Sequence, residues 1–339
     1  MINNQTRTIV LAAGKGTRMK SEQAKVMHEL FFAPMLHHVL AALAPLELLP
    51  ETVVVTGHQA ETVEGSLAGF PVAFARQAEQ LGTAHAVLAA RRFLDSFAGT
   101  VLILCGDTPL IRSSTIRKML DTHHRSGAGL TVMTTSMTDP SNYGRIVSDT
   151  AGAILRIVEE KDASPEEKAI REINAGIYCV EAPFLIRGLS RIDDKNRQRE
   201  FYLTDLIAVA REQGEAVTRF FCPDPLEVLG VNSRVELAEA HSQLQQRRNR
   251  QLMTEGVTIF SPETVAIAPE ASVGMDTVIT GPVTVSGTSI IGAGCRIGPQ
   301  VVIRACRLED GVTVEPFSLL SKCTIPAGQN VAAGTMELG

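Results

Sequence analysis

A short stretch near the N-terminus carries the residue types that bind phosphate. It reads Gly14-Lys15-Gly16-Thr17-Arg18-Met19 and follows an apolar run that ends in Ala12 and Ala13. Glycines let main-chain N–H groups approach a ligand closely, and N–H groups turned toward one point bind anions. Lys15 and Arg18 add positive charge. The stretch indicates a phosphate-binding loop, although a glycine-rich stretch alone is as often a plain turn.

This loop fits neither of two common phosphate-binding motifs. The Walker A spacing, GxxxxGK[ST], is absent, and the dinucleotide-binding pattern GxGxxG fails because Met19 follows Arg18. The neighbouring sequence therefore decides what the loop binds. A further cation, Lys25, follows within a few residues, and a polar stretch extends from Gln77 to His85.

A carboxylate stands directly after a predicted buried strand, in the sequence Leu104-Cys105-Gly106-Asp107. The carboxyl ends of parallel strands are where α/β folds hold ligands and metals. Asp107 could cap a helix instead, but Thr-Pro follows it and a continuous apolar run precedes it. These neighbours favour a metal ligand at this position.

The elements that position these residues alternate along the first two thirds of the chain. Strands are predicted at residues 8–11, 52–56, 72–75, 101–105, 130–134 and 175–180, and helices at 25–43, 84–97 and 114–124. Strands that alternate with helices indicate βαβ units and a mostly parallel sheet.

The sequence changes character between residues 234 and 253. This stretch has no Gly or Pro and is interpreted as one exposed amphipathic helix that serves as a linker. Its basic cluster, residues 247–250, is interpreted as a solvated face near the helix C-terminus, where cations suit the helix dipole. A nucleic-acid-binding patch is the less favoured alternative.

Branched apolar residues then recur every six positions. The series is Ile267, Val273, Ile279, Val285, Ile291, Ile297 and Ile303; Leu308 comes one residue early, and Val314 and Leu320 resume the spacing. This period is typical of a parallel β-helix, whose stacked coils share one apolar axis. An ordinary sheet of short strands would not explain a period of six. After Leu320 the repeat loosens, as in a terminal coil.

The composition excludes several other classes of protein. A net charge of −5, 4% aromatic residues and no Trp argue against nucleic acid as a partner. The six cysteines form no CxxC pair, which indicates free thiols rather than disulfides or zinc. No signal-peptide core and no apolar run of about 20 residues is present. We therefore expect a soluble cytoplasmic protein that binds neither nucleic acid nor membranes.

Nine motifs follow one another along the chain: LAAGKGTRM, AKVMH, QAEQLGTAHA, CGDTPL, NYGRIV, IVEEKDA, EINAGIY, EFYLTDLI and GVNSR. In this order they resemble the N-acetylglucosamine-1-phosphate uridylyltransferases, the first half of the bifunctional bacterial GlmU family. The resemblance covers roughly residues 8–240. The first motif alone would indicate only the wider sugar nucleotidyltransferase superfamily; the later motifs are more specific.

The resemblance implies an architecture and a reaction. Residues 1–232 would form a Rossmann-like α/β nucleotidyltransferase domain, 233–254 a linker helix, and 255–339 a short or truncated left-handed parallel β-helix. The reaction would convert UTP and N-acetylglucosamine 1-phosphate to pyrophosphate and UDP-N-acetylglucosamine, a cell wall precursor, with Mg²⁺. Two alternatives are left open. The enzyme could use another sugar 1-phosphate or nucleotide, or the protein could be a non-catalytic nucleotide-sugar sensor or scaffold.

The resemblance also implies roles for single residues. Lys15, Arg18 and Lys25 would be the catalytic cations, and Asp107 and Asn232 would hold Mg²⁺. The nucleoside would contact Leu11, Ala12, Ala13, Gly14, Gln77, Gly82 and Thr83. The acetamido sugar would contact Gly144, Glu159 and Asn174, with Tyr202 and Thr204 at the pocket edge. Singly, Asn174 could instead cap a turn before Gly176, and Glu159 could lie on a solvated charged face.

Two residues depart from the family pattern. Ala24 stands where proline is usual, which would make the loop before Lys25 less rigid, and Cys105 stands where an aromatic residue is frequent. Neither change removes a group that the chemistry needs.

The chain ends after a few coils, before the region in which GlmU proteins carry an acetyltransferase site. We expect that half to be lacking, either because the chain is a piece of a longer protein or because it is a naturally short relative. Left-handed β-helices such as the one implied by the resemblance commonly pack as trimers, so the remaining coils are expected to form a homotrimer. The apolar ends of a short repeat array also need cover.

Overall fold

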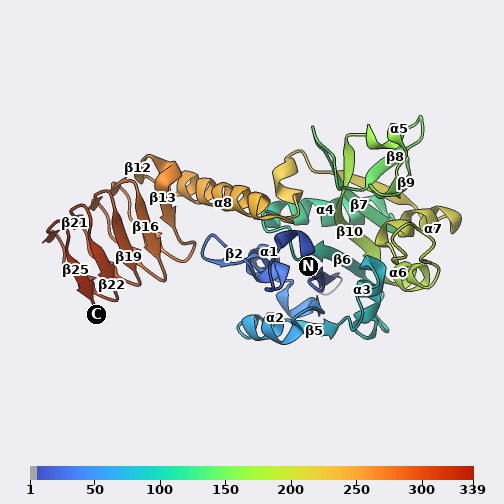
Figure 1. Ribbon diagram of the computed structural model, residues 1–339, viewed down its shortest axis with the longest axis horizontal. Helices are drawn as coiled ribbons and strands as arrows, with labels where there is room; N and C mark the ends of the chain where they lie inside the picture. The colour runs from blue at the N-terminus through green and yellow to red at the C-terminus, as the bar shows by residue number, and fades with distance from the viewer. Residues whose placement is uncertain (1–5) are drawn as a thin grey trace. The chain divides into compact units, whose positions relative to one another are not determined.

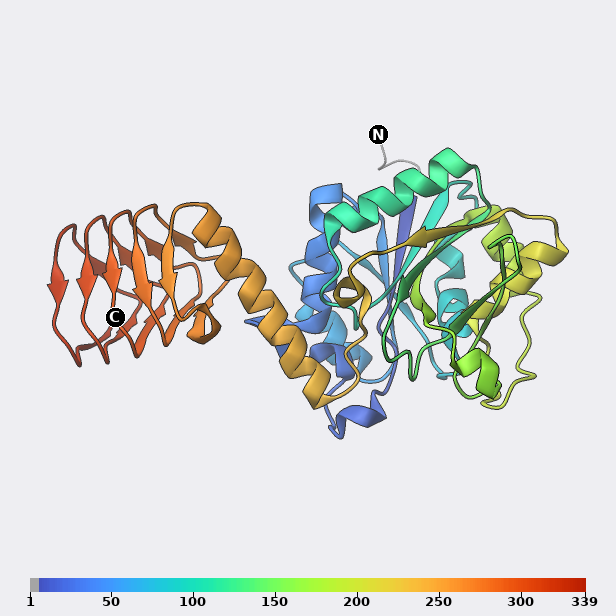
Figure 2. The same ribbon diagram turned by 90° about the horizontal axis from the view of Figure 1, so that it is seen from above.

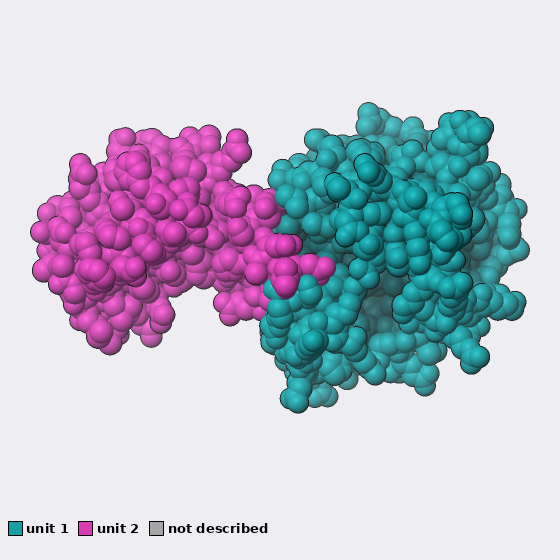
Figure 3. All heavy atoms as spheres, turned by 45° about the horizontal axis from the view of Figure 1, so that its top comes forward, with its two compact units in different colours: residues 1–28, 34–234 teal, residues 29–33, 235–339 magenta. Residues whose placement is uncertain are grey.

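The computed structural model describes residues 6–339, which form two compact units (Figures 1 and 3). Unit 1 contains residues 6–28 and 34–234, and unit 2 contains residues 29–33 and 235–339. The first five residues of the predicted domain 1–232 lie outside the described part of the chain. Within residues 6–339, no helix combines the length and apolar character needed to span a membrane.

Unit 1 is built on a sheet of nine strands. Seven of them follow the order β11-β7-β10-β6-β1-β4-β5, and β8 and β9 extend the sheet beside β10. Their bounds are β1 Thr6–Leu11, β4 Thr52–Thr56, β5 Ala73–Arg76, β6 Thr100–Cys105, β7 Leu130–Ser136, β8 Arg145–Ser148, β9 Ile154–Val158, β10 Glu172–Glu181 and β11 Val217–Phe221. β1 runs parallel to β4 and β6, whereas β10 is antiparallel to β6 and β7. Each of the six predicted strands overlaps one of these strands.

Helices cover both faces of this sheet (Figure 2). They are α1 Met35–Leu43, α2 Ala60–Ser66, α3 Thr83–Ala89, α4 Ser113–Ser126, α5 Pro165–Lys168, α6 Ala182–Leu189 and α7 Leu206–Glu212. Successive residues of β1 enter different cores: Ile9 packs in the core with α3, α6 and α7, and Val10 in the core with α1 and α4. Strands buried on both faces are apolar throughout, which is why these segments were recognisable as strands.

The helix predicted over 25–43 is wrong in its first half. The chain forms a 3₁₀ turn at Lys25–Met27 and two short paired strands, β2 (Glu29–Leu30) and β3 (Ala33–Pro34), before α1 begins at Met35. Pro34 has no N–H for a helix interior, so the helix starts after it. The helix predicted over 84–97 ends at Ala89. The N–H of Ala90 bonds to the Val87 carbonyl, and a separate 3₁₀ turn follows at Arg91–Phe93.

The long helix α8 (Arg234–Thr254) belongs almost entirely to unit 2. The interpretation of its basic cluster as a solvated face is wrong for two residues. Asn249 is buried and its Nδ2 donates to the carbonyl oxygens of Pro262 and Val265, both over 2.7 Å. The Arg248 guanidinium donates to the Ala271 carbonyl over 2.5 Å. Both side chains therefore bind the end of the helix to the first coil of the β-helix.

The rest of unit 2 is a parallel β-helix of three sheets. The sheets are β12-β15-β18-β21-β24, β13-β16-β19-β22-β25 and β14-β17-β20-β23. Their strands are β12 Thr258–Phe260, β13 Val265–Ile267, β14 Ser272–Val273, β15 Val278–Thr280, β16 Val283–Ser286, β17 Ile290–Ile291, β18 Arg296–Ile297, β19 Val301–Arg304, β20 Arg307–Leu308, β21 Thr313–Val314, β22 Leu319–Ser321, β23 Thr324–Ile325, β24 Asn330–Val331 and β25 Met336–Leu338. All residues of the six-residue series are buried except Val273, which is partly buried.

The early Leu308 marks a change in coil length. Ile279 pairs with Ile297, 18 residues on, whereas Ile291 pairs with Leu308 and Leu308 with Ile325, 17 residues on in each case. The apparent loosening after Leu320 is the same five-residue step repeated, and pairing continues to Leu338. The predicted fold class, a Rossmann-like domain followed by a parallel β-helix, is confirmed.

Candidate functional site

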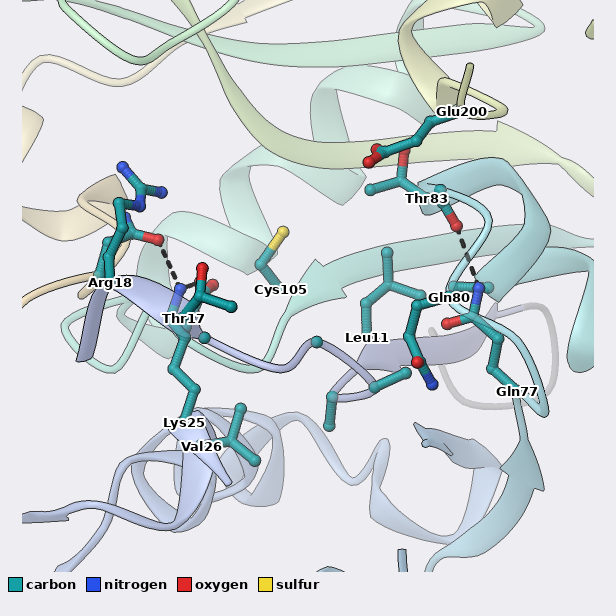
Figure 4. Close-up of a pocket in the computed structure, with 18 residues that line it drawn as sticks. Leu11, Thr17, Arg18, Lys25, Val26, Gln77, Gln80, Thr83, Cys105 and Glu200 are labelled. Atoms are coloured by element: carbon teal, nitrogen blue, oxygen red, sulfur yellow. Dashed lines mark hydrogen bonds and ion pairs between the residues drawn. The ribbon is translucent and has the colours of Figure 1, made fainter. Parts of the chain in front are cut away.

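A cleft of about 400 Å³ opens in unit 1 at the carboxyl ends of β1 and β6. The two strands are parallel neighbours, with Leu11 opposite Cys105, so the loops that follow them emerge side by side. The cleft is lined by Leu11, Ala12, Ala13, Gly14, Gly16, Thr17, Arg18, Lys25, Val26, Gln77, Gln80, Gly82, Thr83, Ala86, Cys105, Asp107, Glu200 and Asn232. Figure 4 shows Thr17, Arg18 and Lys25 at one end of it and Gln77, Gln80 and Thr83 at the other.

The predicted phosphate-binding loop forms one wall of the cleft. Gly16 has a φ of 62°, and a Cβ there would lie 2.5 Å from the Cβ of Lys25, so only glycine lets the loop pass over that lysine. Met19, the residue that breaks the dinucleotide pattern, is buried and anchors the loop. Arg18 lines the cleft, whereas Lys15 is exposed and is not among the lining residues.

Three residues far apart in sequence meet at the loop end of the cleft. The Lys25 ammonium donates to Oδ2 of Asp107 and, over 2.5 Å, to Oδ1 of Asn232. The Asn232 amide donates from Nδ2 to the Gly230 carbonyl over 2.8 Å, which turns its Oδ1 toward Lys25. The N–H of Val231 also donates to the Asp107 carbonyl over 2.8 Å, which ties the two loops together.

The donors at this point fit a divalent metal bound together with phosphates. Mg²⁺ is usually held by one or two carboxylates plus waters and substrate phosphates rather than by a full protein cage. Asp107 and Asn232 offer a carboxylate and an amide oxygen, and a cationic ammonium already lies between them. Among residues 6–339, no cluster of three or more His, Cys, Asp or Glu could form a cage on its own.

The opposite end of the cleft is shaped by Gln77, Gly82 and Thr83. Gln77 is buried, and its Nε2 donates to the Gly82 carbonyl over 3.2 Å. Gly82 has a φ of 116°, and a Cβ there would lie 2.5 Å from the carbonyl oxygen of Phe201. Thr83 Oγ1 accepts a hydrogen bond of 2.9 Å from the N–H of Leu203. These contacts connect the cleft to the segment that carries Tyr202 and Thr204.

The residues predicted to bind the sugar lie together but do not line this cleft. The N–H of Asn174 donates to the Gly144 carbonyl over 2.9 Å, and Thr204 Oγ1 donates to Glu159 Oε1 over 3.2 Å. Burial raises the pKa of Glu159, and the hydrogen bond from Thr204 opposes that shift. Burial also raises the pKa of Tyr202 to about 12. Glu159 is therefore a partly buried, hydrogen-bonded carboxylate and not part of a solvated face.

The side chain of Asn174 caps the turn before Gly176, which was the alternative to sugar binding considered from the sequence. Its Oδ1 accepts from the N–H of Gly176 over 3.0 Å and its Nδ2 donates to the Tyr178 hydroxyl over 2.7 Å. The pairing of β10 with β7 shifts register between Asn174 and Tyr178, with Gly176 at a φ of 72°. The capping contact holds this irregular segment, and a role in sugar binding stays a prediction.

Two features of the cleft were missed or misjudged from sequence. Gln59 supports the loop before Lys25: its Oε1 accepts from the N–H of Ala24 over 2.8 Å and its Nε2 donates to the Glu22 carbonyl over 2.7 Å. Ala24 thus uses the N–H that a proline lacks to hold the loop. Cys105 donates to the Gly176 carbonyl over 3.4 Å, and burial raises its pKa to about 12.

Further lining residues, Val26, Gln80, Ala86 and Glu200, were also not predicted. Val26 lies within the motif AKVMH, and Gln80 and Ala86 lie within QAEQLGTAHA, so the motifs offered a signal for all three. Gln59 follows β4, the strand beside β1, and only the strand order indicates it. Glu200 is the first residue of the motif EFYLTDLI, of which the sequence analysis singled out only Tyr202 and Thr204.

Comparison with known proteins places this architecture in a family. A family model described as nucleotidyl transferase matches residues 7–224. A bifunctional protein GlmU of Desulfotalea psychrophila is 46% identical over 334 residues, which cover 98% of both chains. Another, of Geobacter metallireducens, is 52% identical over 88% of this chain and 63% of its own length.

A crystal structure of a Bacillus anthracis protein, titled a glucose-1-phosphate thymidylyltransferase, shares the fold. It superposes with a TM-score of 0.56 at 20% identity, over 70% of this chain and 94% of that one. With the family model and the two GlmU relatives, the chain belongs to the nucleotidyl transferase family, among the GlmU proteins, and is a sugar-1-phosphate nucleotidyltransferase.

Proposed function

We propose that unit 1 transfers a uridylyl group from UTP to N-acetylglucosamine 1-phosphate, with Mg²⁺ as the metal. The observation that carries this proposal is the cleft itself. Its cationic end holds Arg18, Lys25, Asp107 and Asn232, and its other end holds the buried Gln77. A nucleoside triphosphate fits such a cleft with its phosphates toward the cations.

The nucleoside would lie against Leu11 to Gly14 and beside Gln77, Gly82 and Thr83, all of which line the cleft. The sugar would be bound by Gly144, Glu159 and Asn174, with Tyr202 and Thr204 at the pocket edge. The contacts of Asn174 with Gly144 and of Thr204 with Glu159 support this group as one pocket.

The reaction joins two anions, and its difficulty is to bring them together in line. The sugar phosphate is already ionised at neutral pH, so no general base is required, and catalysis consists of positioning and charge neutralisation. Arg18 and Lys15 would stabilise the leaving pyrophosphate, and Lys25 the attacking sugar phosphate. Asp107 and Asn232 would hold Mg²⁺, which when bound neutralises charge on phosphate oxygens.

A turnover assay with a substrate panel tests the proposal. Purified protein is incubated with UTP, Mg²⁺ and several sugar 1-phosphates, and pyrophosphate release is measured. Release only with N-acetylglucosamine 1-phosphate supports the proposal. Release with another sugar means that the pocket of Glu159 and Asn174 has been misassigned, and no release with any sugar or nucleotide favours a sensor or scaffold. Glucosamine 1-phosphate with acetyl-CoA, run in parallel, tests the proposed lack of acetyltransferase activity.

We further propose that residues 1–232 carry this activity in the cytoplasm, that 233–254 act as a linker, and that 255–339 assemble a homotrimer. Unit 2 exposes large apolar side chains, among them Phe317, Met275 and Phe260 at 71%, 66% and 56%. Such surface supports association with other copies. Light scattering of the purified protein tests the trimer, and a monomeric mass would contradict it.

A further inference from the structure

A lysine ammonium lies between the two oxygens assigned above to the metal. Lys25 Nζ donates to Oδ2 of Asp107 and to Oδ1 of Asn232, and the residue is only 9% exposed. We propose that Lys25 acts as an internal cation that occupies the metal position of the ligand-free site, so that a divalent metal enters only together with the nucleotide. This inference rests on the proposed function, because it takes Asp107 and Asn232 as the metal ligands.

Contacts other than those of Lys25 restrict both residues. The Val231 N–H donates over 2.8 Å to the main-chain carbonyl of Asp107, which fixes the backbone at that residue. Asn232 Nδ2 donates over 2.8 Å to the Gly230 carbonyl, which orients the side-chain amide and its Oδ1. The amide oxygen is therefore oriented independently of the ammonium, and the Asp107 carboxylate extends from a fixed backbone.

The lysine is confined at its main chain and Cβ, and its ammonium is held by the hydrogen bonds to Asp107 and Asn232. Gly16 lies directly over it, with a Cβ at that position only 2.5 Å from the Lys25 Cβ. The main chain before Lys25 is fixed by Gln59 through Ala24. A lysine ammonium sits on a flexible four-carbon stem, so it can turn from the carboxylate to a nearby phosphate while its backbone stays fixed.

Charge explains why the metal would need the nucleotide. The unit charge of Asp107 is balanced by the unit charge of Lys25 in a partly buried site, where ion pairs are screened less than at the surface. Mg²⁺ gives up its waters reluctantly and needs several oxygen ligands, of which these two residues supply only part. A triphosphate adds oxygens for the metal and an anion near the displaced ammonium, whose partner in the complete complex is the sugar phosphate proposed above. Metal binding and Lys25 release are then one coupled event.

The prediction that separates this device from simple metal binding concerns the protein without nucleotide. Replacing Lys25 by methionine keeps the length of the side chain and removes its charge. Lys25→Met should bind Mn²⁺ alone about tenfold more tightly than the wild type, a gain of about 1.4 kcal/mol, because the competing cation is gone. Free Mn²⁺ is measured by electron paramagnetic resonance, with no substrate and no turnover involved.

Three further variants make the comparison specific. Lys20→Met, which removes an exposed lysine beside the same loop, should bind Mn²⁺ as the wild type does. Lys25→Gln should behave as Lys25→Met does and replaces it if that protein fails to fold, as judged by circular dichroism. Adding Asp107→Asn to Lys25→Met should abolish the gain, which places the metal at this site.

Equal Mn²⁺ affinity of the wild type and both Lys25 variants would overturn the inference, as would a gain that survives Asp107→Asn. A different result would contradict the proposed function, namely no pyrophosphate release from a nucleoside triphosphate with any sugar 1-phosphate. The Mn²⁺ comparison tests the role of Lys25 independently of that result.

Discussion

The side-chain oxygen of Gln59 accepts a hydrogen bond of 2.8 Å from the N–H of Ala24, one residue before Lys25. The same amide donates to the Glu22 carbonyl over 2.7 Å, so one side chain bridges both sides of this turn. Gln59 itself has a left-handed φ of 53° directly before α2. Gln59, in the loop after β4, thus fixes the turn that positions Lys25, in the loop after β1.

Gln59→Ala is therefore expected to lower kcat. Both hydrogen bonds to the turn are lost, each worth about 1 kcal/mol, and Lys25 is less firmly placed, so we expect a fall of about tenfold in kcat. The KM for UTP should change less, because the end of the cleft proposed to bind the nucleoside is untouched. Steady-state kinetics with both substrates measure the two effects. Unchanged kcat would show that the turn holds its shape without Gln59.

A double-mutant cycle with Ala24→Pro tests whether Gln59 acts through this contact. The φ of Ala24 is −53°, which proline can adopt, but proline has no N–H to donate. In the Ala24→Pro background, Gln59→Ala should cost less than it does in the wild type. Gln59→Glu keeps the acceptor for Ala24 and loses the donor to Glu22, so an intermediate effect is expected. Strictly additive effects would mean that the two residues act independently.

Asp107→Ala should nearly abolish turnover and leave the fold intact. It removes the carboxylate of the proposed metal pair, and losing the charge stabilisation that a metal gives to phosphate oxygens costs several kcal/mol, or about a thousandfold in kcat. The measurement pairs pyrophosphate release with a thermal melt. Asp107→Asn, which keeps the shape and loses the charge, is the matched variant. An active Asp107→Ala protein with an unchanged melting temperature would contradict the metal assignment.

Glu159→Gln should raise the KM for the sugar 1-phosphate and leave the KM for UTP unchanged. Gln keeps the size of the side chain and an acceptor for Thr204, but loses the negative charge that the acetamido sugar's donors would meet. Because a hydrogen bond to a charged group contributes about 1.5–3 kcal/mol, a rise of roughly ten- to a hundredfold is expected. Equal effects on both substrates would instead indicate a general disturbance of unit 1, for which Glu61→Gln, an exposed residue of α2, provides a baseline.

The sequence predicted best those features that follow from a local pattern. The six-residue series marks the β-helix because each member must face one apolar axis, and the apolar runs mark strands buried on both faces. The failures arise where distant parts of the chain decide the outcome. Phe31 and Phe32 continue a helix-like apolar pattern, yet Phe31 stacks edge-on against His241 and Phe32 packs on the core of unit 2, so these residues form a turn instead. The hydrogen bonds of Lys25 to Asp107 and Asn232 depend on the order of the strands in the sheet and on the passage of Gly16 over the lysine. A sequence motif shows neither of these features.

The carboxylate of Asp205 makes the stability of unit 1 depend on pH. Burial raises its pKa from an ordinary value of 3.8 to about 6, with the nearby Asp193 and Asp162 adding to the shift. The folded state therefore binds a proton more tightly than the unfolded state, and stability is lost as the pH rises from about 4 through about 6. Asp205→Asn removes this dependence. At pH 7 it should raise the free energy of unfolding by about 1 kcal/mol, less than the full shift because water screens a partly exposed group.

Urea unfolding followed by tyrosine fluorescence between pH 4.5 and about 7.5 measures this effect. All three tyrosines, Tyr143, Tyr178 and Tyr202, lie in unit 1, and the chain has no Trp, so the signal reports on that unit alone. Asp139→Asn is the control with the opposite sign, because hydrogen bonds from Ser141 lower the pKa of Asp139 and the charged form is the one stabilised. The expected stabilisation of Asp205→Asn grows as the pH rises through 6. A stabilisation that is the same at every pH would show that Asp205 is not protonated in the folded protein, so that burial does not raise the pKa of this carboxylate.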